Sequence, residues 1–282
     1  MAKIRIVTDS TADLPRELVE QYNITVVPLN VIFGEETYLE SVDLTADDFY
    51  RKLAQSTVLP TTSQPSPGEF VTAYEPLVAE GAEIISLHIS GLMSGTVQAA
   101  RLAQGMLKYP KLEVVDTQGV SILLGAMVLE AARAVERGCT FQEVKELVAS
   151  FKSRHQVFFT VDTLDYLQRG GRIAKAAAFL GTLLNIKPVL TIKDGEIYPC
   201  EKVRGLNRAF DRMVDITLEE FGGDTPLRCY LAHGDAPEYA EMLQERLQER
   251  LNLIEILKSR VGPVVGTHAG PRIAGTVVWR DA

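Results

Sequence analysis

The order strand, polar loop, helix occurs three times in the first half of the chain, and this repetition restricts the folds available to it. Residues 3–7 alternate between polar and apolar side chains, residues 8–13 are mostly polar, and apolar residues then follow at helical spacing. The same order returns at residues 83–106 and at residues 112–135. Because strands that alternate with helices form parallel sheets with right-handed crossovers, we predict an α/β fold with an N-terminal parallel sheet and flanking helices.

The second half of the chain contains a sequence pattern typical of antiparallel strands. Asp194-Gly195 separates two apolar stretches, residues 188–192 and 196–203, and this dipeptide favours a tight hairpin between antiparallel strands. Thr140 and Glu143 form a capping box that starts a helix before this half begins. With 282 residues, the chain is long enough for two domains of roughly 100 to 200 residues. We therefore predict an N-terminal α/β domain at 1–153 and a C-terminal mixed α/β domain at 154–282.

Composition narrows the classes of function. Acidic residues outnumber basic ones by 37 to 29, and no dense run of Lys or Arg is available to follow a phosphate backbone, which argues against a nucleic-acid partner. The longest apolar stretches, such as residues 120–129, are too short to span a bilayer, and the first residues carry no signal-peptide pattern. We expect no integral membrane segment and a cytoplasmic location.

The cysteines and histidines give no metal-ligand spacing. Cys139, Cys200 and Cys229 are far apart and odd in number, so we interpret them as buried apolar side chains rather than as disulfide or zinc ligands. His268 stands between glycines in residues 266–271 and is either a structural histidine or part of a site, with no second ligand at a suitable spacing. We expect neither a metal nor a cofactor.

Two polar segments lie where anions bind in folded proteins. Ser66 and Glu69 form a capping box, so a helix begins there, and Thr61 and Thr62 lie beside its N-terminus. They belong either to an anion site or to a solvated loop. The loop at residues 90–96 precedes another helix, where Ser94 serves as a cap or as a ligand and Gly95 lets the backbone approach a bound group.

Motifs for nucleotide binding and for a serine nucleophile are absent from the sequence. The chain contains no G-x-x-x-x-G-K-[ST] and no G-x-G-x-x-G, and Ser94 does not lie in G-x-S-x-G. Arg172, after Gly170-Gly171, and Arg204, after a predicted strand, are either surface charges or groups held near an anion. The sequence thus indicates an anion site without an assignable catalytic group.

As a set, these motifs resemble the DegV family. The resemblance extends over nearly the whole chain, and it rests on six motifs that occur in the family's order, at residues 9–14, 62–66, 90–96, 170–173, 186–188 and 266–271. It implies a two-domain DegV-like fold with a fatty acid between the domains. It also implies a non-catalytic subunit of a bacterial fatty acid kinase, which presents the carboxylate to a separate, dihydroxyacetone-kinase-like ATP-binding subunit that forms an acyl phosphate for phospholipid synthesis.

The resemblance also implies the kind of ligand and the residues that bind it. It implies a long-chain ligand of about 16 to 18 carbons, whose methylenes each contribute about 0.8 kcal/mol on burial. Two other functions remain open: a free-standing hydrolase or phosphotransferase that acts on a small anion through His268, and a lipid carrier or sensor without a kinase.

In the family pattern, the fatty-acid-binding positions are Thr61, Thr62, Ser94, Gly95 and His268, and the positions at the pocket mouth or kinase contact are Arg172 and Arg204.

Overall fold

The structure, a computed structural model, describes residues 3–181 and 186–281. Its first sheet has four parallel strands in the order β2-β1-β6-β7, which confirms the predicted parallel sheet. Each polar loop predicted to follow a strand does so at its carboxyl end. The strands are β1 (Ile4–Asp9), β2 (Thr25–Val27), β6 (Glu83–His88) and β7 (Leu112–Asp116).

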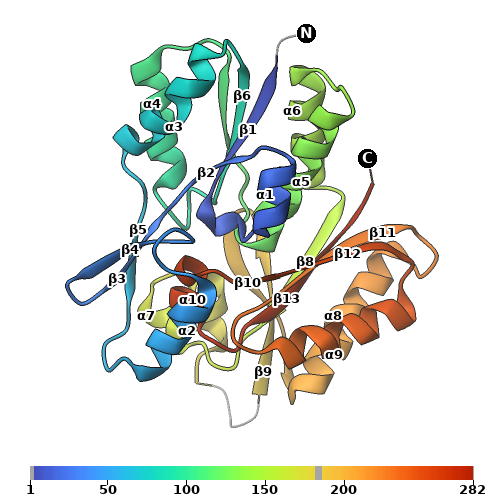
Figure 1. Cartoon of the computed structure of the whole chain (residues 1–282). Helices are drawn as coiled ribbons and strands as arrows, with labels where there is room; N and C mark the ends of the chain where they lie inside the picture. The colour runs from blue at the N-terminus through green and yellow to red at the C-terminus, as the bar shows by residue number, and fades with distance from the viewer. Residues whose placement is uncertain (1–2, 182–185, 282) are drawn as a thin grey trace.

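Helices cover both faces of this parallel sheet (Figure 1). α3 (Pro67–Ala79) and α4 (Thr96–Leu107) pack on one face, where Phe70, Tyr74 and Ala100 are fully buried. α1 (Arg16–Gln21), α5 (Ile122–Glu136) and α6 (Phe141–Phe151) pack on the other. The capping boxes predicted at Ser66 and Thr140 are confirmed at the first turns of α3 and α6.

The second sheet is mixed and contains six strands in the order β10-β9-β8-β13-β11-β12, of which only β11 and β12 pair in parallel. The predicted hairpin is confirmed: Asp194 and Gly195, both with positive φ, join β9 to β10. The strands are β8 (His155–Thr160), β9 (Ile186–Lys193), β10 (Glu196–Arg204), β11 (Leu227–His233), β12 (Leu253–Arg260) and β13 (Ala274–Arg280).

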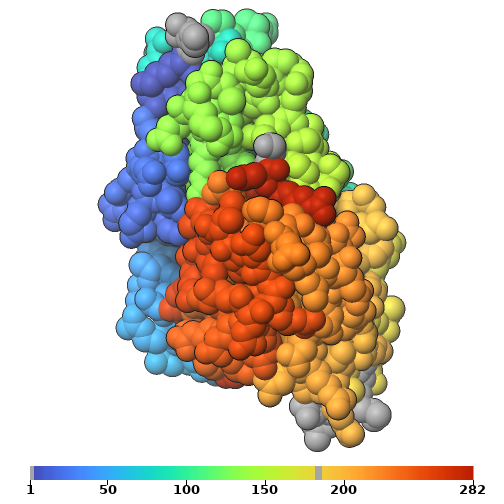
Figure 2. Space-filling view, turned by 90° about the vertical axis from the view of Figure 1, so that its right-hand side faces the viewer, coloured from blue at the N-terminus to red at the C-terminus, as the bar shows by residue number. Residues whose placement is uncertain are grey.

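One face of the six-stranded sheet is covered by α8 (Leu206–Phe221) and α9 (Pro237–Arg250). Figure 2 shows this side of the molecule, with the green α5–α6 segment above the orange and red C-terminal elements. The opposite face meets α5, because Met127 and Leu123 share a core cluster with Phe159 and Trp279. Every strand of this sheet lies beyond residue 153, but the domain boundary itself stays a prediction.

A third, antiparallel sheet was not predicted. It has the order β4-β3-β5 and packs with α2 (Ala46–Gln55) against α10 (Pro263–Ala269), which belongs to the other end of the chain. Its strands are β3 (Asn30–Phe33), β4 (Glu36–Leu39) and β5 (Thr61–Ser63). The remaining short elements are η1 (Ser10–Ala12), α7 (Asp165–Arg169) and η2 (Ala174–Phe179).

Three details differ from the predictions or bear on them. Residues 61–63 form a strand, which the sequence did not indicate, and residues 263–269 form a short helix despite their glycine and valine content. Cys229 is buried as predicted, whereas Cys139 is only partly buried and Cys200 is exposed. Cys200 lies where the register of the β9–β10 pair shifts. In the part of the chain that the structure describes, no helix is both long and apolar enough to cross a membrane.

Candidate functional site

A cavity of about 110 Å³ lies where the two halves of the chain meet. Strands, loops and helices from both halves contribute to its wall, since Ile122 of α5 faces it together with Phe159 of β8 and Val264 of α10. Most of the wall is apolar, and its apolar residues are Leu29, Ile89, Met93, Val120, Ile122, Val157, Phe158, Phe159, Leu167, Ile192, Ile197, Ala232, Val261, Val264, Val265, Ala269 and Ile273.

The polar part of the wall centres on Thr62 and His268. Thr62 Oγ1 lies 2.8 Å from His268 Nε2, so β5 and α10 are joined by a hydrogen bond inside the cavity. When the imidazole proton is on Nε2, the ring donates to Thr62 and the Thr62 hydroxyl hydrogen is free to donate to a ligand. The other polar residues of the wall are Ser63, Gln64, Ser94, Ser121 and Arg172.

His268 is held neutral. Burial, and to a lesser extent the nearby Arg172 guanidinium, together lower its pKa to about 4. Nδ1 is buried and has no hydrogen-bond partner among residues 3–181 and 186–281. A Cβ on Gly170 would lie 2.2 Å from Nδ1, so the absence of a side chain at Gly170 makes room for the ring. At neutral pH the ring is therefore a hydrogen-bonding group rather than a cation.

Ser94 lies at the start of α4. Its Oγ is 2.8 Å from Thr96 Oγ1 and accepts a hydrogen bond from the Thr96 N–H at 3.3 Å. Gly95 is the N-cap residue, and a Cβ there would lie 2.6 Å from Gln64 Nε2. Gly95 therefore allows the Gln64 side chain to pack close to the helix start, beside Ser94.

Arg172 brings a positive charge to this polar region while remaining exposed. Its Nε donates to the Met93 carbonyl at 3.2 Å, and its Nη1 donates to the Gly170 carbonyl at 2.8 Å. These two bonds tie the guanidinium to the residue before Ser94 and to the residue beside His268. Since a guanidinium carries five N–H donors, others remain available to an anion.

Two residues of the predicted set lie elsewhere. Thr61 is exposed and lies outside the cavity wall, whereas the next residue, Thr62, is part of it. Arg204 is exposed at the end of β10 and also lies outside the wall. The structure thus brings together Thr62, Ser94, Arg172 and His268, with Gly95 at the edge of the group.

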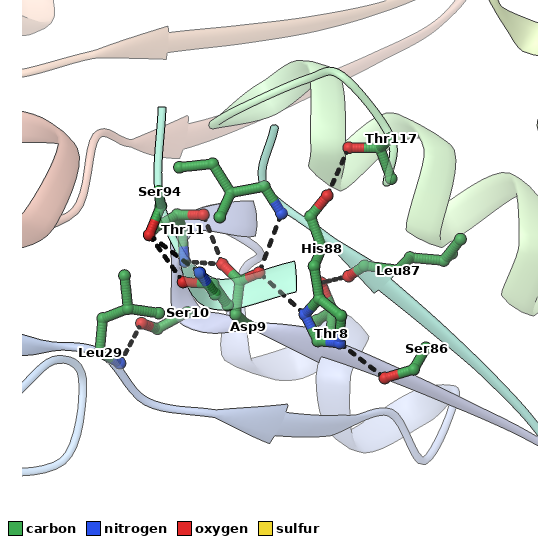
Figure 3. Close-up of polar contacts among 12 residues, drawn as sticks. Thr8, Asp9, Ser10, Thr11, Leu29, Ser86, Leu87, His88, Ser94 and Thr117 are labelled. Carbon is green, nitrogen blue, oxygen red and sulfur yellow. Dashed lines mark hydrogen bonds and ion pairs between the residues drawn. The ribbon is translucent and has the colours of Figure 1, made fainter. Parts of the chain in front are cut away.

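Behind Ser94, the ends of β1 and β6 are joined by a buried polar network that sequence analysis missed (Figure 3). Asp9 Oδ2 lies 3.0 Å from His88 Nδ1 and accepts from the Ile89 N–H at 3.0 Å. His88 Nε2 lies 2.7 Å from Ser86 Oγ, which in turn lies 2.8 Å from the Tyr74 hydroxyl. The network fixes the start of the loop that carries Ser94. The one hint in the sequence is that a histidine, His88, comes just before the polar loop at residues 90–96.

In the described part of the chain, no group of three or more His, Cys, Asp or Glu side chains is arranged to hold a metal ion. The fold and the cavity together define an α/β protein with a parallel sheet in its first half, a mixed sheet in its second half, and a cavity with apolar and polar wall residues where the halves meet. The chain belongs to the DegV family, because the family model described as "Uncharacterised protein, DegV family" matches residues 3–281.

Relatives of known sequence are similar over almost their whole length. A DegV domain-containing protein of Halalkalibacterium halodurans is 40% identical over 273 residues, with 96% of each chain covered. Protein DegV of Bacillus subtilis is 37% identical over 278 residues, with 98% of each chain covered.

Solved structures of the family are similar to this chain over almost their whole length. A Thermus thermophilus DegV family protein, described in terms of fatty acid binding, has a TM-score of 0.93 and 37% identity, covering 99% of this chain and 100% of its own. DegV of Bacillus subtilis, described as a fatty acid binding protein, has a TM-score of 0.90, 34% identity and full coverage of both chains. A stearic-acid-binding protein of Eubacterium ventriosum has a TM-score of 0.85 and 28% identity, covering 99% and 98%.

Proposed function

We propose that the protein binds a long-chain fatty acid in the cavity, with the carboxylate at Thr62, Ser94, Arg172 and His268. The observation that carries this proposal is the composition of the wall, which is mostly apolar and also carries the hydrogen-bonded pair Thr62 and His268. An acyl chain matches the apolar part and a carboxylate matches the hydroxyls. Relatives described as fatty acid binding, at 34% to 37% identity, support the assignment.

The polar groups suit a carboxylate that must stay reactive. A buried carboxylate needs hydrogen bonds to offset its lost hydration, and the hydroxyls of Thr62 and Ser94 supply them. The exposed Arg172 adds positive charge at the edge of the cavity. Each buried methylene contributes about 0.8 kcal/mol, so a chain of about 16 to 18 carbons would be retained firmly even if only part of that energy is realised.

We infer further that the protein is a non-catalytic subunit, acting in the cytoplasm, that presents this carboxylate to a separate ATP-binding kinase subunit of the dihydroxyacetone-kinase type. In that reaction, a carboxylate oxygen attacks the γ-phosphorus of ATP, the bond to the β-phosphate oxygen breaks, and ADP leaves. The product is an acyl phosphate. Arg172 and Arg204 are exposed cations that an acidic kinase surface could meet.

Extraction of the purified protein with organic solvent, followed by mass spectrometry, tests the ligand. We expect a long-chain fatty acid in near-stoichiometric amount. Protein that contains no fatty acid, and that also fails to bind added palmitate or oleate, would contradict the proposal.

The docking role of Arg204 is tested by charge reversal. Arg204→Glu should keep its fatty acid and lose most acyl phosphate formation with the kinase subunit and ATP, with partial recovery at higher kinase concentration. Arg101→Glu, on the exposed face of α4, is the matched control and should behave as wild type. Loss of the fatty acid from Arg204→Glu would place Arg204 in the pocket, and normal phosphorylation would remove it from the docking surface.

The alternative of a free-standing hydrolase or phosphotransferase rests on one observation, the 2.8 Å contact between the Thr62 hydroxyl and the His268 imidazole. A nucleophile and base need a third group that orients the base, and Nδ1 of His268 has no such partner among the described residues. Hydrolysis of acyl esters or phosphoesters by the purified protein alone, lost in His268→Gln, would favour this alternative. Retained lipid with no phosphorylation by any kinase subunit would favour a carrier or sensor.

A further inference from the structure

Two buried carboxylates, Asp13 and Glu40, hold the segment that leads into α10. Asp13 Oδ1 accepts a hydrogen bond from the Gly262 N–H at 2.9 Å, and Glu40 Oε1 accepts one from the Val264 N–H at 2.7 Å. Asp13 Oδ2 also accepts from the Ser121 hydroxyl. Both carboxylates come from the N-terminal half of the chain, whereas Gly262 and Val264 come from the C-terminal half.

The two carboxylates are close to each other. A Cβ on Gly262 would lie 2.6 Å from Glu40 Oε1 and 2.7 Å from Asp13 Oδ1, so the two oxygens are no farther apart than the sum of these distances. Glu40 is 1% exposed and Asp13 is 8% exposed. In the described ranges, no Lys or Arg forms an ion pair with either, and Glu40 Oε2 has no hydrogen bond of good geometry. Two full negative charges are costly in such a place.

Burial favours a shared proton at this pair. It raises the pKa of Glu40 to about 7, although the Ser10 hydroxyl and the Val264 N–H act in the opposite direction. Burial and the nearby Glu40 raise the pKa of Asp13 well above its ordinary value. The other titratable groups close to the pair are Asp9, Tyr50 and Tyr230, and Asp235 and Arg260 lie next to Tyr50.

These neighbours do not neutralise the pair. Tyr50 donates its hydroxyl to the Val261 carbonyl at 3.1 Å, and Tyr230 donates to the Asp13 carbonyl at 2.9 Å. Burial raises the pKa of both tyrosines, so they stay neutral. Arg260 pairs with Asp47 and Asp235, and its guanidinium lies over the Tyr50 ring rather than beside Asp13 or Glu40.

The segment held by the pair is also cavity wall. Val261 and Val264 line the cavity, as does Ser121 on the other side of Asp13. His268 lies near the end of the same short helix, about one turn beyond Val264, because an α-helix advances about 5.4 Å per turn. A shift at the start of α10 therefore moves both the apolar wall and the polar group that bonds Thr62.

We propose that Asp13 and Glu40 share one proton and act as a latch that holds α10 against the cavity, and that loss of this proton loosens α10 and speeds ligand release. The inference rests on the proposed function, since it concerns the same cavity. With the proton present, one carboxyl is neutral and both bonds to Gly262 and Val264 persist. Without it, repulsion between the carboxylates favours separation and hydration, which breaks the contact between the two halves at this point.

The test measures the dissociation rate of a C16 ligand from the full chain between pH 6 and 8.5, a range in which His268 stays neutral. Hexadecanesulfonate is used beside palmitate because its head group does not titrate in this range. For both ligands we expect the rate to rise about tenfold, the effect of one pKa unit of differential interaction, with a midpoint near 7. Glu40→Gln keeps an acceptor for the Val264 N–H and cannot ionise, so its rate should be slow and independent of pH.

Each outcome separates the latch from the binding function. No binding of palmitate by wild type at any pH would contradict the proposed function. If wild type binds hexadecanesulfonate but its dissociation rate does not change with pH, the latch is wrong, and no variant is needed to show it. The latch is also wrong if the dissociation rate of Glu40→Gln changes with pH as much as that of wild type. Asp13→Asn provides a second variant if Glu40→Gln does not fold: it removes the repulsion between the two carboxylates, so its rate should rise less with pH than that of wild type.

Discussion

Thr61 and Thr62 are adjacent in the sequence, and only Thr62 lines the cavity. This pair therefore offers a matched test of the head-group assignment. Thr62→Ala removes a donor to a charged group and should weaken palmitate binding by about 1.5 to 3 kcal/mol, roughly 10- to 150-fold in Kd. Thr61→Ala should bind as wild type. Calorimetric titration of delipidated protein at pH 7.5 gives both values, and equal losses in the two variants would show that the carboxylate lies elsewhere.

Gly170 tests the position of His268 without changing the histidine. An alanine Cβ there would lie 2.2 Å from Nδ1, which forces the ring away from Thr62 Oγ1. We expect Gly170→Ala to weaken palmitate binding about tenfold, equivalent to one lost hydrogen bond of about 1.4 kcal/mol. Gly105→Ala, where nothing lies within 4 Å of the added Cβ, should leave affinity unchanged. Unchanged affinity in Gly170→Ala would mean that the ring position is unimportant for binding.

At the scale of elements, Asp9 joins β1, η1 and β6. It accepts hydrogen bonds from Thr11 and from the Ile89 N–H and contacts His88, all of them buried. Asp9→Ala leaves these groups without an acceptor, so we expect the free energy of unfolding to fall by about 3 to 5 kcal/mol. Urea denaturation measures this loss. Asp224→Ala, at an exposed turn, is the control and should change stability by less than about 0.5 kcal/mol.

Elements with local signals were predictable from sequence. The capping boxes at Ser66 and Thr140 and the Asp194-Gly195 turn depend on residues within a few positions of each other, and all three are confirmed. The loops after β1, β6 and β7 follow from the same local logic. Thr62 and Ser94 were therefore identifiable as polar residues near helix starts, although not as members of one cavity.

Elements that depend on distant partners were missed. α10 contains glycine and two valines in seven residues, a composition with low helix propensity, and it forms where distant carboxylates accept from Gly262 and Val264. Residues 61–63 form a strand only because β3 lies beside them. The Asp9–His88 network joins residues 79 positions apart, which no sequence spacing reveals.

At the scale of the whole molecule, α5 connects the two large sheets. Almost all of its residues are buried, which fits a helix that is apolar all round and enclosed on several sides. Leu124 and Val128 pack toward the parallel sheet, and Leu123 and Met127 pack toward the six-stranded sheet. Arg133 near its end bonds Glu255 of β12. The cavity lies beside this shared helix, so stability and ligand binding are coupled through the same packing.

The pH dependence of the free energy of unfolding reports on the groups at this cavity. Two buried groups, Glu40 and His268, change it in opposite directions. The pKa of Glu40 is raised from 4.5 to about 7, so its contribution is fully present below pH 4.5 and is lost as pH rises through 7. The pKa of His268 is lowered from 6.5 to about 4, so its contribution is present above pH 6.5 and is lost as pH falls through 4. In wild type the two effects partly cancel between pH 4.5 and 6.5.

Glu40→Gln removes one of the two opposing effects. Relative to wild type, its free energy of unfolding should increase progressively between pH 4.5 and about 7.5, by up to about 3 kcal/mol, because wild type alone must ionise a buried carboxyl. Below pH 6.5 the variant should lose stability more steeply than wild type as pH falls, since the opposing effect of Glu40 is absent. Urea denaturation of delipidated protein at several pH values gives both curves. Parallel curves for the two proteins would show that Glu40 does not bind a proton more tightly in the folded state, and the latch would then lose its physical basis.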